Sequence, residues 1–146
     1  MRVLIIDDSV VMRRIVEKAL RHSGLEVTEV ADAGNGSEAL AFLEKLAPGP
    51  PLGLILCDVH MPVLDGPGFL FEKRCRDLAP GVPVVMITAD TTDPHLLRAI
   101  AAGADGYIAK PFTLEEMQTG IVSLLDSRNQ ASLATVPVRS RIGGAR

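Results

Sequence analysis

The chain has 146 residues, of which 47% are apolar and 23% are charged, so its length and composition indicate one soluble globular domain with a sizeable core. No apolar stretch approaches the roughly 20 residues that a membrane-spanning helix needs, and the amino end runs into Asp7 and Asp8 without a cleavage-site pattern. We therefore expect a cytoplasmic protein without a membrane segment or a signal peptide. Cys57 and Cys75 are too far apart for a CxxC motif, and we expect both to be small core residues in a reducing compartment.

Charge is unevenly distributed along the sequence and helps to place a domain boundary. Residues 1–127 contain all 18 acidic residues and 11 of the 15 basic ones, whereas residues 128–146 contain only basic charges. The first segment has no excess of basic charge that would indicate direct binding to nucleic acid. We predict a folded domain over 1–127 and a flexible basic extension over 128–146, which is a linker, a weak contact for an acidic partner or an inert extension.

The folded segment alternates between strand and helix patterns five times. Short apolar runs bounded by turn residues predict strands, at residues 3–6, 25–30, 54–58, 82–87 and 107–109. Apolar residues at helical spacing follow each run, and the residues expected to face inward include Met12, Ile15, Val16, Leu43, Leu46, Phe69, Leu96, Leu97, Leu114, Met117 and Ile121. Helix-capping signals are expected at Ser9, Ser37, Asp93 and Thr113, and Gly66-Pro67-Gly68 is expected to precede the third helix. Five such units with right-handed connections predict an α/β protein with a doubly wound, five-stranded parallel sheet and five helices.

Chemically active side chains follow four of the predicted strands. The first strand ends at Asp7 and Asp8, the third at Asp58, the fourth at Thr88 and the fifth at Lys110. Because parallel strands end at one edge of the sheet, we expect these groups to lie together where α/β proteins bind ligands. Three close carboxylates need a cation between them, and an all-oxygen site suits Mg²⁺. The alternative for Asp58 is a residue that only caps the next turn.

The histidines do not indicate a zinc site. His22, His60 and His95 are scattered through the sequence without a paired spacing, and we expect each to be a surface or turn residue.

Five ordered groups of residues resemble the receiver domain of bacterial response regulators, closest to the single-domain chemotaxis type. They are Asp7-Asp8, Asp58 with Met61-Pro62 and Asp65-Gly66, Thr88-Ala89, and residues 107–112, Tyr-Ile-Ala-Lys-Pro-Phe. The resemblance covers residues 1–127 and implies a flavodoxin-like sheet with strand order 2-1-3-4-5. It also implies a cis bond between Lys110 and Pro111.

The resemblance implies roles for the residues at the sheet edge. Asp58 would accept a phosphoryl group from a phosphohistidine of a sensor histidine kinase, assisted by Lys110 and Thr88. Mg²⁺ would be held directly by Asp8 and Asp58, through water by Asp7, and by the backbone carbonyl of His60. Hydrolysis of the acyl phosphate would reset the protein, and His60 and Asp90 would help to set the rate of this hydrolysis. Because the chain would act only on its own Asp58, we do not expect an enzyme in the ordinary sense.

The output would follow from a coupled movement of two residues. Thr88 would move toward the phosphoryl group, and Tyr107 would turn inward and reshape the face formed by the fourth helix, fifth strand and fifth helix, which a partner protein reads. The alternative for Tyr107 is plain packing. The pathway, chemotaxis included, and weak self-association are left open.

There are three alternatives, of which the first two are weaker. A haloacid dehalogenase-type phosphatase would carry a second Asp two places after the nucleophile, where this chain has His60. A nucleotide-binding protein would carry a glycine-rich first turn, where this chain has Asp7-Asp8-Ser9. The serious alternative is a receiver module of a longer regulator whose output domain lies beyond residue 128.

Overall fold

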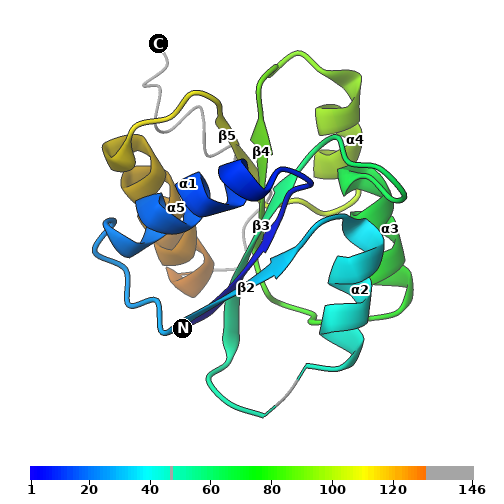
Figure 1. Cartoon of the computed structure of the whole chain (residues 1–146), viewed down its shortest axis with the longest axis horizontal. Coiled ribbons are helices and arrows are strands. Elements are labelled where there is room, and N and C mark those ends of the chain that lie inside the picture. Colours follow the sequence, from blue (N-terminus) through cyan, green and yellow to red (C-terminus); the bar gives the residue numbers. More distant parts are fainter. Residues whose placement is uncertain (47, 131–146) are drawn as a thin grey trace.

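The computed structural model describes residues 1–46 and 48–130 and contains a central five-stranded parallel sheet of order β2-β1-β3-β4-β5. The strands are β1 (Arg2–Ile6), β2 (Glu29–Ala33), β3 (Leu52–Asp58), β4 (Val84–Thr88) and β5 (Gly106–Ala109). The helices are α1 (Val10–Arg21), α2 (Gly36–Glu44), α3 (Gly66–Cys75), α4 (Pro94–Ala101) and α5 (Leu114–Gln130). Figure 1 shows α1 and α5 on one face of the sheet and α2, α3 and α4 on the other. The predicted fold class and strand order are confirmed.

The sheet has a hydrophobic core on each of its faces. Its central strands are apolar at nearly every position, and every residue of β1 and β4 is buried, as expected of parallel strands covered by helices on both sides. Alternate side chains point to opposite faces, so Leu4 and Met86 join the cluster under α2, α3 and α4, whereas Ile5 and Val85 join the cluster under α1 and α5.

Three local predictions were wrong. The second strand begins at Glu29 rather than at Leu25, because pairing with β1 decides its position more than its own weak apolar alternation. The α2 helix is capped by Asn35, whose side chain accepts from the Glu38 N–H, and not by Ser37. Gly66 and its two successors form the first turn of α3 after the Asp65 cap.

Some side chains predicted to face the core are exposed. Leu97 is 63% exposed, and Ile15 and Leu114 are also exposed, since each lies at the margin of its helix's apolar stripe. Leu46 is exposed because α2 already ends at Glu44. Cys75, predicted to be in the core, is exposed as well, whereas Cys57 is buried.

The remaining caps agree with the sequence. Ser9 and Asp93 accept backbone N–H groups at the starts of α1 and α4. Thr113 and Glu116 form the reciprocal hydrogen bonds of a capping box, at 3.0 and 2.9 Å. The α5 helix continues to Gln130, beyond the expected boundary at 127, and residues 131–146 of the expected extension lie outside the described residues. Within the described ranges, none of the helices is long and apolar enough to cross a membrane.

Candidate functional site

Three carboxylates meet at the carboxyl edge of the sheet. Strands β1 and β3 are paired so that Ile6 lies opposite Cys57, and the next residues along each strand are therefore neighbours. Asp7, Asp8 and Asp58 each offer a carboxylate oxygen, and these oxygens lie within 4.8 Å of one another. The sequence prediction that these side chains converge is confirmed.

Lys110 faces the carboxylates from the end of β5. Its Nζ lies 3.6 Å from Asp58 Oδ1 and 4.0 Å from Asp7 Oδ2. The backbone N–H of Lys110 donates to the Thr88 carbonyl at 2.7 Å, and this hydrogen bond fixes the start of the loop that follows β5 against β4. The Lys110-Pro111 bond is cis, as the resemblance implied.

Burial and mutual repulsion act against ionisation of two of the acids. Burial raises the pKa of Asp58 above its usual value of 3.8, and the charge of Asp8 adds to this, while Lys110 and the Val59 N–H partly offset it. Burial likewise raises the pKa of Asp7, and the Asp58 charge adds to it, against a hydrogen bond from the Ser9 N–H. The single positive charge of Lys110 does not balance the negative charge of three carboxylates, so the site favours a further cation.

Thr88 ends β4 at the same sheet edge as the cluster, and Tyr107 lies on the neighbouring strand β5. Thr88 is buried, and its hydroxyl donates to the Asp90 carbonyl at 3.0 Å and accepts from the Asp90 N–H at 3.1 Å. Tyr107 is paired opposite Met86 and is only partly buried, against the core cluster on the α4 side of the sheet. The two proposed switch residues therefore lie on adjacent strands.

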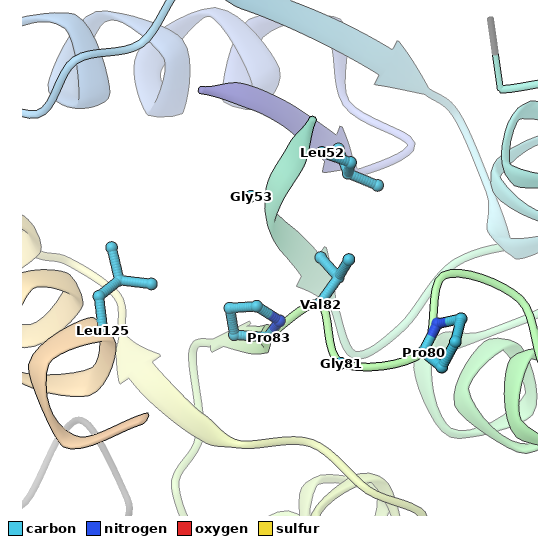
Figure 2. A pocket seen from close by; sticks show the side chains of 7 residues that line it. All are labelled: Leu52, Gly53, Pro80, Gly81, Val82, Pro83 and Leu125. Atoms are coloured by element: carbon cyan, nitrogen blue, oxygen red, sulfur yellow. The ribbon is translucent and has the colours of Figure 1, made fainter. Parts of the chain in front are cut away.

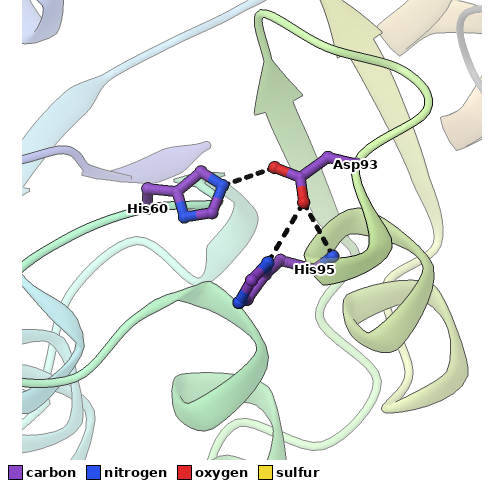
Figure 3. A group of neighbouring side chains, drawn as sticks. All are labelled: His60, Asp93 and His95. Atoms are coloured by element: carbon purple, nitrogen blue, oxygen red, sulfur yellow. Dashed lines mark hydrogen bonds and ion pairs between the residues drawn. The ribbon is translucent and has the colours of Figure 1, made fainter.

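His22 and His60 are exposed and His95 is partly exposed, as expected of surface or turn residues, but His60 and His95 lie close together in space. The His60 imidazole is hydrogen-bonded through Nε2 to Asp93, and the ring centroids of His60 and His95 lie 4.8 Å apart. Figure 3 shows the Asp93 carboxylate joined to both rings. Since β3 and β4 are neighbours, the loops that follow them lie side by side, and this was the signal available in the sequence.

Arg13 is a further residue that the sequence analysis missed. Its guanidinium donates to the Asp7 carbonyl oxygen, and its Nε lies 3.9 Å from Asp32 Oδ2 on β2. Arg13 thus ties α1 to the backbone that carries Asp7 and Asp8.

A hollow elsewhere on the surface does not belong to this site. Figure 2 shows it lined mainly by apolar side chains at the amino-terminal end of β3 and just before β4, among them Leu52, Val82 and Pro83. Because it lies at the opposite end of these strands from Asp58, it does not contribute to the carboxylate cluster.

Comparison with known proteins shows the family. The sequence model of the response regulator receiver domain matches residues 3–122. The chain therefore belongs to the receiver domains of two-component response regulators, which are signalling modules.

Relatives include both single-domain and longer proteins. The chain is 32% identical over 129 residues to the chemotaxis protein CheY of Pseudomonas aeruginosa, covering 88% of this chain and 99% of that protein. It is 35% identical over 134 residues to the probable transcriptional regulator ycf27 of Cyanophora paradoxa, covering 92% of this chain and 52% of that protein. The chain thus spans about half the length of several curated relatives that it matches.

Solved structures agree with this assignment. The chemotaxis response regulator CheY4 of Vibrio cholerae is similar with a TM-score of 0.71 and 32% identity, over 84% of this chain and 97% of that one.

Proposed function

We propose that Asp58 accepts a phosphoryl group from a phosphohistidine of a sensor histidine kinase in a Mg²⁺-dependent reaction. The observation that carries this proposal is the position of Asp58 at the carboxyl edge of the sheet, in a cluster of three carboxylates and 3.6 Å from the Lys110 ammonium. Asp7 shares the burial, the two acidic neighbours and a contact with Lys110, but its carboxylate is farther from the ammonium, at 4.0 Å.

The transfer exchanges one bond to phosphorus for another. An Asp58 carboxylate oxygen attacks phosphorus, the bond between phosphorus and the donor imidazole nitrogen breaks, and an acyl phosphate results. Lys110 offsets charge on the phosphoryl oxygens. The Thr88 hydroxyl would donate a hydrogen bond to one of these oxygens after it breaks its hydrogen bonds with the Asp90 backbone.

The donor set at the cluster fits Mg²⁺. It consists of carboxylate oxygens, which a small hard cation prefers, and burial together with the neighbouring acids raises the pKa values of Asp7 and Asp58. Asp8 and Asp58 would hold the ion directly, Asp7 through water, and His60 through its backbone carbonyl. The bound ion supplies positive charge that balances the phosphoryl group.

Hydrolysis of the acyl phosphate returns the protein to its resting state. His60 and Asp90 flank the site and are proposed to influence the rate. The His60 imidazole is directed to Asp93, and the Asp90 carboxylate accepts from both the N–H and the hydroxyl of Thr92, so neither side chain is free to contact Asp58 in this conformation.

The output surface is proposed to be the face formed by α4, β5 and α5. Leu97 on α4 is 63% exposed, and the partly buried Tyr107 lies on β5, so an apolar side chain and a movable ring are available to a partner protein. Movement of Thr88 toward the phosphoryl group would free space beside Tyr107.

The phosphoacceptor is tested by labelling with acetyl phosphate. We expect acid-stable, base-labile label in the wild type with Mg²⁺, none with EDTA, and none in Asp58→Asn. Asp126→Asn, which removes an exposed acid of α5 outside the site, is the matched control and keeps the label. Label retained in Asp58→Asn would refute the assignment.

Two arrangements of the whole protein are supported by different relatives. Coverage of 99% of a chemotaxis CheY favours a single-domain arrangement, and the similarity to this protein and to CheY4 is what supports a chemotaxis role. Coverage of about half of the ycf27 relatives favours the longer arrangement, in which the receiver domain is joined beyond α5 to an output domain. The gene's stop codon distinguishes them, and a pull-down with and without beryllofluoride identifies the partner.

A further inference from the structure

A second group of metal-ligand side chains lies beside the carboxylate cluster. It consists of His60 on the loop after β3, Asp93 at the N-cap of α4, and His95 in the first turn of α4. One ligand atom of each lies within 4.8 Å of the others. Figure 3 shows both rings turned toward the carboxylate.

Two ring nitrogens and a carboxylate converge in this group. His60 Nε2 contacts Asp93 Oδ2, and His95 Nδ1 lies 3.1 Å from Asp93 Oδ1. Each of these atoms has a lone pair that binds either a shared proton or a metal ion. Tetrahedral zinc ligands at about 2.0–2.2 Å from the ion are roughly 3.4 Å apart, so small side-chain movements are sufficient to surround an ion.

The helix start orients two of the three groups. Asp93 Oδ1 accepts the His95 backbone N–H at 2.8 Å, which fixes the carboxylate and the first turn of α4 together. The Asp93 side chain is only 13% exposed, whereas the His60 side chain is 60% exposed and can adjust. A largely fixed pair and an adjustable third ligand can form a site without rearrangement of the backbone.

We propose that His60, Asp93 and His95 form a surface binding site for Zn²⁺ that joins the loop after β3 to the start of α4. Two imidazoles and one carboxylate are a ligand set that zinc accepts, with water completing four-coordination. This set differs from the all-oxygen cluster of Asp7, Asp8 and Asp58, which suits Mg²⁺. Zinc at this site would hold α4 against the loop that follows Asp58.

The site is tested with the untagged full chain, because an affinity tag of histidines binds zinc itself. Zn²⁺ binding is measured by titration calorimetry with excess Mg²⁺ present to occupy the carboxylate cluster. We expect His60→Gln and His95→Gln each to weaken Zn²⁺ binding about tenfold or more. His22→Gln is the matched control, since His22 lies at the C-terminal end of α1, and it leaves binding unchanged.

Imidazole proton resonances give a second readout that does not depend on variants. The chain has three histidines, and Zn²⁺ is expected to shift the ring signals of His60 and His95 but not those of His22. Asp8→Asn tests the other cluster and leaves these shifts intact. Binding that survives both histidine substitutions, shifts absent from His60 and His95, or binding lost in Asp8→Asn would overturn the proposal. None of these readouts requires Asp58 to carry phosphate, so the site and the proposed function fail separately.

Discussion

Lys110 Nζ lies 3.6 Å from Asp58 Oδ1, although the two residues come from strands that are separated by β4. The same ammonium is 4.0 Å from Asp7 Oδ2, so one cation faces acids from β1 and β3. Because Asp8 adds a third carboxylate, the cluster retains excess negative charge. This imbalance, at an edge that is partly buried, is the physical basis of the first two predictions.

Replacing Lys110 by Met is expected to raise the pKa of Asp58 further. Lys110 is the strongest influence that lowers this pKa, and burial and Asp8 would then act with less opposition. Carbon NMR titration of the Asp58 carboxyl in EDTA measures the change. Lys45→Met, which removes an exposed lysine after α2, is the control and leaves the titration in place. An unchanged Asp58 titration in Lys110→Met would show that the lysine does not act on this acid.

Replacing Asp58 by Asn is expected to stabilise the protein at pH 7 in EDTA, by about 1 kcal/mol, the scale of one contact between like charges. The folded-state pKa of Asp58 lies above its usual value of 3.8. The favourable contribution of Asp58 to folding stability is therefore fully present below pH 3.8 and is lost as the pH rises through the folded-state pKa. Asn does not titrate, so its contribution does not change with pH.

Urea unfolding between pH 3 and pH 7.5 measures this difference. The stability advantage of Asp58→Asn should shrink as the pH falls toward 3. Adding Mg²⁺ at pH 7.5 should stabilise the wild type more than the variant, because the ion binds the folded cluster. An Asn variant that is less stable than the wild type at pH 7 would contradict the charge imbalance.

Sequence patterns predicted the parts of the fold that depend on strong local signals. The apolar runs of β1 and β4 and the caps at Ser9 and Thr113 gave correct elements, because burial on both faces and hydrogen bonding at helix starts are encoded locally. Local sequence signals did not specify the position of β2. Its residues are largely polar or half-exposed, and its register comes from pairing with β1.

The same distinction applies to the site. The acids and Lys110 end well-predicted strands, so the topology alone brings them to one edge. The meeting of His60 with Asp93 and His95 depends instead on how two loops curve toward each other, and on the rotamer of an exposed ring. Such details follow from packing between distant segments, which hydrophobic periodicity does not report.

Gly66 is predicted to be intolerant of even a methyl group. A Cβ there would lie 2.7 Å from the Asp58 carbonyl oxygen and 2.7 Å from Met86 Cε. Since the backbone of Asp58, the proposed phosphoacceptor, cannot move away cheaply, Gly66→Ala should lower the free energy of unfolding by about 1–3 kcal/mol and slow acetyl phosphate labelling. In Gly34→Ala, the control, the nearest atom belongs to the flexible Glu38 side chain at 3.3 Å, and we expect a smaller effect. Equal effects of the two substitutions in urea unfolding would refute the argument.

The Thr88 hydroxyl is predicted to hold the loop between β4 and α4 in its resting conformation. It exchanges two hydrogen bonds with the backbone of Asp90, and Val has nearly the same shape without the donor and acceptor. Thr88→Val should therefore cost about 1 kcal/mol of stability and speed amide hydrogen exchange at Asp90, while Thr88→Ser keeps both. In the wild type, beryllofluoride with Mg²⁺ should speed the same exchange, because the hydroxyl leaves Asp90 to meet the phosphoryl mimic. If beryllofluoride binds and Asp90 exchange stays slow, Thr88 does not move and the output face must be controlled by another residue.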